Sequence, residues 1–438
     1  MVDSDGAQEA REEQIARILK RVEDRLRKEM PSGPQTLEEI ERDVEEIGEE
    51  IKRDIQDEVL DALGTGHAGK TLPCSCGSAS RYRGDFVRSI VTLQGEQAIA
   101  RSYYYCGSCR KGFHPLDRAL ALGRGHCSVG VVALACRFAS YLPFAVAAQE
   151  LEMVCGIRLS ASSVQRLAKQ TGRTLLAEWE EREKRLRTSP CAEPKGPAPE
   201  QLHISMDGVM AHVDGAWREV KLGVCYERAQ EGGPSTAAYY ATLEPSDKFG
   251  RRLRALSWAA NEPLCRKVAV LADGSDWIWK EAAKHFTQRT QILDFFDASE
   301  HLWTVAHARF GDDAVAASEW ISKQKARLLE NQAAAVIENI REWQPARAAD
   351  QETRRKELGY LTTHAGRMKY KTYKDNGFHI GSGVMESSCR WVVQQRMKGA
   401  GMRWSRDGAE SMLQLRTAWC SRSHRELMNA ARRAAMAA

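Results

Sequence analysis

The first 63 residues carry apolar side chains at the spacing of a helix. In the second half of this segment they recur at steps of three or four residues, which is typical of an amphipathic helix. Thr36 is followed three residues later by Glu39, and this spacing predicts a capping box at a helix start. We predict two helices, over residues 12–30 and 36–63. They would form a hairpin that packs on the body or on another copy of the chain, and the alternative is a flexible acidic arm.

The pattern changes over residues 72–115, where two runs of strand type lie between pairs of cysteines. The runs FVRSIVTL and QAIARSYYY meet at Gln94 and Gly95, which predicts a β-hairpin. Four thiolates at the ends of such a hairpin are the ligand set of a tetrahedral structural zinc site. The candidate ligands are Cys74, Cys76, Cys106 and Cys109. The first pair is one residue closer than the usual spacing, so unmetallated buried thiols are the alternative to a zinc-ribbon-like segment.

Residues 116–187 have a helical pattern with a glycine turn inside it. The run FAVAAQELEMVCG ends at Gly156, and Ser160 can cap a second helix with the sequence ASSVQRLAKQTGR. Basic side chains on that helix would face solvent, as in a helix-turn-helix-like domain that binds DNA. These basic residues are Arg166, Lys169 and Arg173. A helix pair that serves only for packing is the alternative.

A proline-rich segment, 188–200, predicts a linker and a domain boundary, because four of its residues are proline. Three strand-like runs follow it, and two more then alternate with helical segments. This order predicts a multidomain α/β protein with an RNase H-like mixed-sheet core, whose first part covers residues 201–297. Residues 298–376 are helical throughout and form an all-α insertion. Residues 377–438 would return to the core as a helix with a basic tail.

Three carboxylates stand at informative positions in this second half. Asp207 lies on the first strand-like run, Asp273 ends the fourth, and Glu386 heads the helix after the insertion. The first and fourth strands of an RNase H-like sheet are neighbours, so the three side chains would converge. Such oxygen ligands suit Mg²⁺, and two ions about 4 Å apart can promote cleavage of a phosphodiester. The alternatives are turn residues for the two Asp-Gly pairs and an ion pair with Arg390 for Glu386.

Composition narrows the class of protein. Of the 438 residues, 43% are hydrophobic and 28% are charged, as in soluble globular proteins. We expect neither a membrane span nor a signal peptide, and the scattered cysteines favour a reducing cytoplasm. The net charge of +5 hides an asymmetry, because residues 1–63 hold 20 acidic and 10 basic side chains. The basic remainder of the chain favours a polyanionic partner.

Four stretches of the second half resemble the DDE transposases of bacterial insertion sequences. They are SMDGVM, LADGSDWIW, LDFFDASEHLW and IGSGVMESSCRWVVQQRMKGAGMRWS. The resemblance is to the Kra-type group, near the Mutator-like branch, and it assigns Asp207, Asp273 and Glu386 as the catalytic triad. That family tends to carry a Cys or Asp closely followed by His after the fifth strand. Here Asp294 takes the first place, Asp297 stands where the histidine is expected, and His301 lies one turn further on.

The resemblance implies a transposase that binds element ends and target DNA, with Mg²⁺ (or Mn²⁺) at the triad and structural Zn²⁺ at the cysteines. It would cleave 3′ ends and transfer strands as a homo-oligomer in a synaptic complex, in the cytoplasm and associated with the nucleoid. A basic, aromatic group after Glu386 would hold DNA, namely Arg396, Lys398, Arg403 and Trp404. Two other functions stay open. One is a DNA-binding regulator with an inert RNase H-like fold, and the other is an RNase H-like nuclease without strand transfer.

Overall fold

The computed structural model describes residues 4–30, 33, 35–188, 199–228 and 234–437 of the chain. The protein has a mixed α/β, multidomain architecture in which helices predominate. It divides into two compact units, of which the first comprises Met1–Ala168 with Met428–Ala438, and the second comprises Lys169–Leu427. The division falls inside a helix, whereas the predicted linker at 188–200 lies largely outside the described residues.

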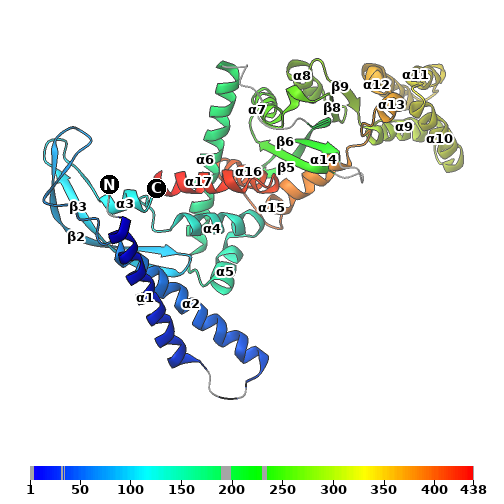
Figure 1. The fold of residues 1–438 in the computed structure, drawn as a ribbon. Coiled ribbons are helices and arrows are strands. Elements are labelled where there is room, and N and C mark those ends of the chain that lie inside the picture. The colour runs from blue at the N-terminus through cyan, green and yellow to red at the C-terminus, as the bar shows by residue number, and fades with distance from the viewer. Residues whose placement is uncertain (1–3, 31–32, 34, 189–198, 229–233, 438) are drawn as a thin grey trace. The chain divides into compact units, whose positions relative to one another are not determined.

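The first unit begins with an antiparallel pair of helices, α1 (Ser4–Glu29) and α2 (Leu37–Ala62) (Figure 1). Arg17 of α1 donates a 2.6 Å hydrogen bond to the buried Glu58 of α2, which joins the two helices. The predicted capping box is present, since Thr36 and Glu39 exchange side-chain and backbone hydrogen bonds.

A four-stranded antiparallel sheet with the order β1-β2-β3-β4 follows α2. Its two long strands form the predicted hairpin, in which Thr92 pairs with Gly95 beside the turn. The strands are β1 (Thr71–Pro73), β2 (Ala79–Thr92), β3 (Gly95–Cys106) and β4 (Lys111–Phe113), and the helices after them are α3 (Pro115–Ala119), α4 (Val129–Tyr141) and α5 (Phe144–Cys155). The unit also includes the part of α17 (His424–Ala437) from Met428 onward.

The helix α6 (Ala161–Thr188) is continuous over 28 residues, so it is much longer than the recognition helix that the sequence predicted. Its start agrees with the prediction. Gly156 adopts φ 64° at the end of α5, and the Ser160 hydroxyl accepts a 3.2 Å hydrogen bond from the N–H of Ser163. The part of α6 beyond Ala168 belongs to the second unit, so most of its length serves as a packing element there.

The second unit contains a five-stranded mixed sheet with the order β7-β6-β5-β8-β9, of which β5, β6, β8 and β9 are labelled in Figure 1. The pairs β5·β6 and β6·β7 are antiparallel, whereas β5·β8 and β8·β9 are parallel. The strands are β5 (Gln201–Val213), β6 (Ala216–Arg228), β7 (Pro234–Thr242), β8 (Lys267–Ala272) and β9 (Thr290–Leu293). The helices α7 (Ser246–Ala259) and α8 (Asp276–His285) and a 3₁₀ turn at Glu262–Leu264 connect these strands. The parallel pair β5 and β8 thus lies at the centre of the sheet.

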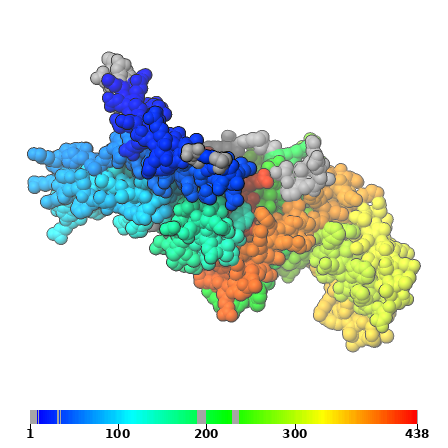
Figure 2. Space-filling model, turned by 90° about the horizontal axis from the view of Figure 1, so that it is seen from below, coloured from blue at the N-terminus to red at the C-terminus, as the bar shows by residue number. Residues whose placement is uncertain are grey.

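Helices alone make up the chain between β9 and the segment that carries Glu386. They gather in one lobe, yellow-green to light orange in Figure 2. The lobe consists of α9 (Phe295–Phe310), α10 (Ala314–Leu329), α11 (Ala333–Glu342), α12 (Ala348–His364), a 3₁₀ turn (Ala365–Arg367) and α13 (Tyr370–Asp375). The C-terminal elements of the unit are α14 (Gly383–Ser388), a π-helical turn (Cys389–Gln394), α15 (Gln395–Met397) and α16 (Arg406–Cys420).

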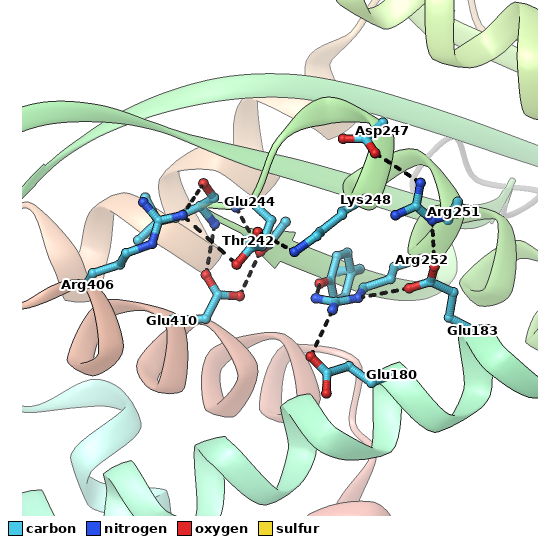
Figure 3. A network of polar contacts seen from close by, with 12 residues as sticks. Glu180, Glu183, Thr242, Glu244, Asp247, Lys248, Arg251, Arg252, Arg406 and Glu410 are labelled. Atoms are coloured by element: carbon cyan, nitrogen blue, oxygen red, sulfur yellow. Dashed lines mark hydrogen bonds and ion pairs between the residues drawn. The ribbon is translucent and has the colours of Figure 1, made fainter.

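Buried charged groups tie α6, α7 and α16 to the edge of the sheet (Figure 3). Arg252 of α7 donates to the Tyr240 hydroxyl at 2.6 Å and to Glu180 of α6 at 3.2 Å. Glu410 of α16 accepts hydrogen bonds from the Thr242 hydroxyl and the Leu243 N–H, at 2.7 and 2.9 Å. Arg252 and Glu410 are themselves buried, so the loss of a partner would leave a buried charge less well satisfied. These contacts therefore hold α6, α7 and α16 at this edge of the sheet.

Candidate functional site

The four predicted metal-binding cysteines come together at one end of the four-stranded sheet. All four sulfur atoms lie within 4.8 Å of one another. The Sγ atoms of Cys74 and Cys109 are 3.5 Å apart, and those of Cys76 and Cys106 are 3.6 Å apart. Two thiolates on one tetrahedral zinc ion, with bonds of about 2.3 Å, are about 3.8 Å apart. The cluster therefore fits a metal ion such as zinc.

Backbone N–H groups favour the thiolate form at two of these cysteines. The N–H of Cys76 is the main cause that lowers the pKa of Cys74 to about 6, and the N–H of Cys109 lowers the pKa of Cys106. Metal binding requires thiolates, so these N–H groups favour ligation at Cys74 and Cys106. At Cys109 the N–H of Lys111 also favours the thiolate, but hydrogen bonding with Cys74 raises the pKa of Cys109 to about 11. The close spacing of the first pair is accommodated by a tight turn, in which Gly77 has φ 87° and donates to the Cys74 carbonyl at 3.0 Å.

An open cleft in the second unit brings the three predicted magnesium ligands to one surface. Asp207, Asp273 and Glu386 all line it. Asp207 lies within β5, and Asp273 directly follows β8, the parallel neighbour of β5. Three more acidic residues line the same cleft, namely Asp294, Asp297 and Glu300.

The three carboxylates line the same cleft, but their oxygen atoms are too far apart to bind one metal ion together. Among the residues that the structure describes, only the cysteine cluster brings three or more ligand atoms within 4.8 Å of one another. Two oxygens on the same Mg²⁺ ion are at most about 4.2 Å apart, so binding an ion requires the carboxylates to move closer. Glu386 has the freedom to move, because its side chain is 76% exposed. The ion pair with Arg390 that the sequence suggested is present at 3.5 Å.

Burial makes ionisation costly at the two aspartates. Desolvation raises the pKa of Asp207, although hydrogen bonds from the Cys389 thiol (3.3 Å) and the Gly208 N–H (2.6 Å) oppose the rise. Desolvation also raises the pKa of Asp273, which accepts a 2.9 Å hydrogen bond from the N–H of Ser275. A divalent cation would offset this cost, because an adjacent positive charge favours the charged form. The donor set and its burial therefore fit a hard divalent cation.

Glu386 lies in the first turn of α14, which continues into the π-helical turn Cys389–Gln394. Both elements pack on β5. The loop before α14 is anchored to the same strand, because Nε2 of the buried His203 accepts a 3.1 Å hydrogen bond from the N–H of His379. π-Helical turns are rare and frequently occur at functional sites. This one places the helix that carries Glu386 beside Asp207.

The two predicted auxiliary aspartates lie at the start of α9. Asp294 is its N-cap, with a 2.9 Å hydrogen bond from the N–H of Phe296, and it also accepts a hydrogen bond from the Ser382 hydroxyl. Asp297 accepts hydrogen bonds from the N–H of Gly274, at 3.1 Å, and from the Tyr360 hydroxyl.

His301, the third predicted auxiliary residue, makes its ring contacts with the helical lobe. The ring stacks on Tyr360 with 3.5 Å between centroids, and Nδ1 contacts Glu357 of α12. Its surroundings are therefore those of a residue that supports Tyr360. Asp294 and Asp297 line the cleft, whereas His301 does not.

The predicted DNA-contacting residues after Glu386 divide into a buried and an exposed pair. Arg396 and Trp404 are only 2% and 9% exposed, and the guanidinium lies 4.9 Å from the centroid of the indole ring. The backbone N–H of Trp404 donates to the carbonyl of His212 on β5, which draws this segment into the core. In this structure the buried pair packs in the interior and does not reach a DNA surface. Lys398 and Arg403 are exposed, as expected.

The basic residues of α6 also differ in their surroundings. Lys169 and Arg173 both pair with Asp407 of α16, at 2.5 and 2.6 Å. Arg166, in the first unit, is exposed. Two of the three predicted cations thus have a carboxylate partner within the protein.

Trp391 is a candidate functional residue that the sequence pattern did not single out. Its side chain is 46% exposed, and it lines an open surface together with Glu386, Arg390 and Lys398. Trp391 belongs to the π-helical turn, where the ordinary helical period fails. The available signal in the sequence was a tryptophan directly after Arg390.

No family model matches this chain. A curated relative is the UPF0236 protein in the vanSb 3′ region of Streptococcus gallolyticus, which is 24% identical over 350 residues. The aligned part covers 76% of this chain and 72% of that protein. Among the described helices, none combines the length and the apolar character needed to cross a bilayer.

Proposed function

We propose that this protein is a DDE-type transposase that binds the ends of a mobile DNA element and catalyses metal-dependent cleavage and strand transfer. The observation that carries this proposal is that Asp207, Asp273 and Glu386 line one open cleft, although they lie far apart in the sequence. Asp207 on β5 and Asp273 directly after β8, the parallel neighbour of β5, are both half-buried. Isolated turn residues or surface ion pairs would have no reason to gather in this way.

The order of the strands supports an RNase H-like core. Numbered from β5, the sheet has the order three-two-one-four-five, with the first three strands antiparallel and the last two parallel to the first. The helices α9 to α13 separate the fifth strand from α14. This arrangement agrees with the interrupted core that the resemblance implies.

The residues of the cleft have separable roles in the proposed reaction. Asp207 and Asp273 would hold Mg²⁺ or Mn²⁺ from the sheet, and Glu386 would complete the site from the helix. The bound ions would provide Lewis-acid stabilisation and an activated water or 3′-hydroxyl. The Gly208 N–H and the Cys389 thiol orient the carboxylate of Asp207 from two directions.

We assign DNA contact to the exposed surface beside Glu386. Lys398, Arg403 and Arg390 would neutralise phosphates, which positions a backbone without reading its sequence. The exposed ring of Trp391 offers a face for stacking on a base or sugar. Sequence-selective binding of the element ends would belong to the α5–α6 region, where Arg166 is an exposed cation. The metal ion at the cysteines would stabilise the zinc-ribbon-like sheet, and homo-oligomers would hold two element ends together.

The test uses purified protein and a labelled DNA fragment from the flank of its gene, with Mg²⁺ and a target plasmid. A transposase nicks the fragment at one 3′ end and joins that end to the plasmid. Nicking without joining would instead indicate an RNase H-like nuclease. Binding without any cleavage would indicate a regulator whose RNase H-like fold is inert.

A further inference from the structure

The first turn of α9 makes a separate contact with each of two segments that carry a proposed metal ligand. The first contact involves Asp294, whose side chain accepts hydrogen bonds from the Phe296 N–H and the Ser382 hydroxyl. Ser382 is the N-cap of α14, and its carbonyl accepts a 3.0 Å hydrogen bond from the N–H of Glu386. Asp294 therefore holds the residue from which the Glu386 helix begins.

The second contact involves Asp297. One of its oxygens, Oδ2, accepts hydrogen bonds both from the N–H of Gly274, at 3.1 Å, and from the Tyr360 hydroxyl. Gly274 directly follows Asp273, so this contact fixes the turn in which Asp273 lies.

Tyr360, on α12 of the helical lobe, contacts the same turn. A Cβ atom added at Gly274 would clash with the Tyr360 ring, so glycine is needed for this approach. On its other side Tyr360 is stacked by His301, which itself contacts Glu357 of α12. The tyrosine is therefore held from two sides while its hydroxyl donates to Asp297.

We propose that Asp294 and Asp297 are positioning residues, which hold the Glu386 helix and the Asp273 turn at the spacing that metal binding requires. The inference rests on the proposed function, because it assumes that Asp273 and Glu386 bind a metal ion. Asp294 is 5% exposed and uses both oxygens for hydrogen bonds, so it presents little to an ion. In Asp297 the oxygen that faces Gly274 is occupied by two donors.

Asparagine substitutions distinguish a positioning role from a ligand role. After Asp297→Asn, the amide oxygen would still accept hydrogen bonds from Gly274 and Tyr360. After Asp294→Asn, the amide oxygen would still cap α9, and the amide N–H would donate to the Ser382 hydroxyl oxygen in place of the bond that Asp294 accepts. A metal ligand, in contrast, loses its charge in such a substitution. The variants to compare are Asp294→Asn, Asp294→Ala, Asp297→Asn and Asp297→Ala, with Asp273→Asn as the reference for a lost ligand.

The measurement is Mn²⁺ binding to the full-length protein, followed by the EPR signal of the free ion and therefore independent of DNA cleavage. Both Asn variants should stay close to the wild type. Both Ala variants should bind about 10- to 100-fold more weakly, the range typical for residues that orient metal ligands, and Asp273→Asn should lose binding. Tyr360→Phe and Ser382→Ala, which are milder changes, should weaken binding in the same direction. Thermal melting checks that each variant is folded.

Two results would overturn the inference. If Asp297→Asn binds as poorly as Asp273→Asn, then Asp297 is a ligand. If the Ala variants and Tyr360→Phe all bind like the wild type, then α9 does not position the site. If the wild-type protein binds Mn²⁺ at the cleft but never cleaves DNA, the proposed function is contradicted and the inference about α9 is not. The Mn²⁺ affinities of the variants relative to the wild type would still show whether Asp294 and Asp297 position the metal ligands.

Discussion

The thiol of Cys389 donates a 3.3 Å hydrogen bond to the carboxylate of Asp207. Cys389 opens the π-helical turn that follows Glu386, and Asp207 lies within β5. The bond therefore links the helix of one proposed ligand to the strand of another. Burial, together with the charge of Asp207, raises the pKa of Cys389, so the thiol remains a neutral donor at neutral pH.

We expect Asp207→Asn to stabilise the protein in the absence of divalent ions. Burial raises the pKa of Asp207 in the folded state, so the folded state holds this proton more tightly than the unfolded state. The ionised form therefore costs stability at neutral pH, and the cost disappears as the pH falls through the unfolded-state pKa. In EDTA, the variant should melt at a higher temperature than the wild type near pH 7, and the difference should shrink towards about pH 4.

The exposed Asp276→Asn substitution is the matched control for that comparison, since it changes the same kind of group three residues beyond Asp273. It should leave the melting temperature nearly as it is. If Asp207→Asn melts below the wild type near neutral pH, the burial cost assigned to Asp207 is wrong.

The cysteine cluster predicts about one equivalent of bound zinc. A Cys106→Ser, Cys109→Ser double variant should lose this metal, because it removes two of the four sulfur ligands. Metal analysis of the purified protein measures the content, and Cys155→Ser, outside the cluster, is the control. Full zinc content in the double variant would place the metal elsewhere.

The buried and the exposed residues after Glu386 should respond differently to truncation. Lys398→Ala should weaken DNA binding and reduce the slope of affinity against salt by about one, as expected for a lost phosphate contact. Trp404→Ala should instead lower the free energy of unfolding by about 3–5 kcal/mol, because it removes a buried aromatic ring. DNA titrations at several salt concentrations and denaturant unfolding separate the two effects. If Trp404→Ala leaves the free energy of unfolding unchanged but weakens DNA binding, then Trp404 contacts DNA and does not serve as a buried packing residue.

Local sequence patterns predicted those features that depend on nearby residues. The Thr36 capping box, the cysteine hairpin and the alternation of strands and helices after residue 200 all follow from spacing and turn residues. The position of Asp207 beside Asp273 followed from the expected neighbour relation of their strands, which the parallel pairing of β5 and β8 realises.

The features that sequence patterns missed depend on partners far along the chain. From the sequence, Arg396 and Trp404 were predicted to contact DNA. In the structure the backbone of Trp404 hydrogen-bonds to β5 and the guanidinium of Arg396 stacks on the indole ring. Arg173 is exposed as predicted, but the ion pairs of Lys169 and Arg173 with Asp407 were missed because Asp407 lies more than 200 residues away. The length of α6 was also missed, since its second half is stabilised by ion pairs of Glu180 and Glu183 with α7 rather than by a strong local signal.

The most direct test of the proposed function is the Glu386→Gln substitution, which keeps the size of the side chain but removes its charge. DNA nicking and joining with Mg²⁺ should fall by orders of magnitude, because the site loses a metal ligand, while folding and binding of element ends persist. Asp207→Asn and Asp273→Asn should show the same loss, and the three losses should not add. The measurement is joining of a labelled element end to target DNA, with Asp276→Asn as the control. If the Glu386→Gln protein joins DNA as well as the wild type, Glu386 is only the surface partner of Arg390 and the proposed active site is wrong.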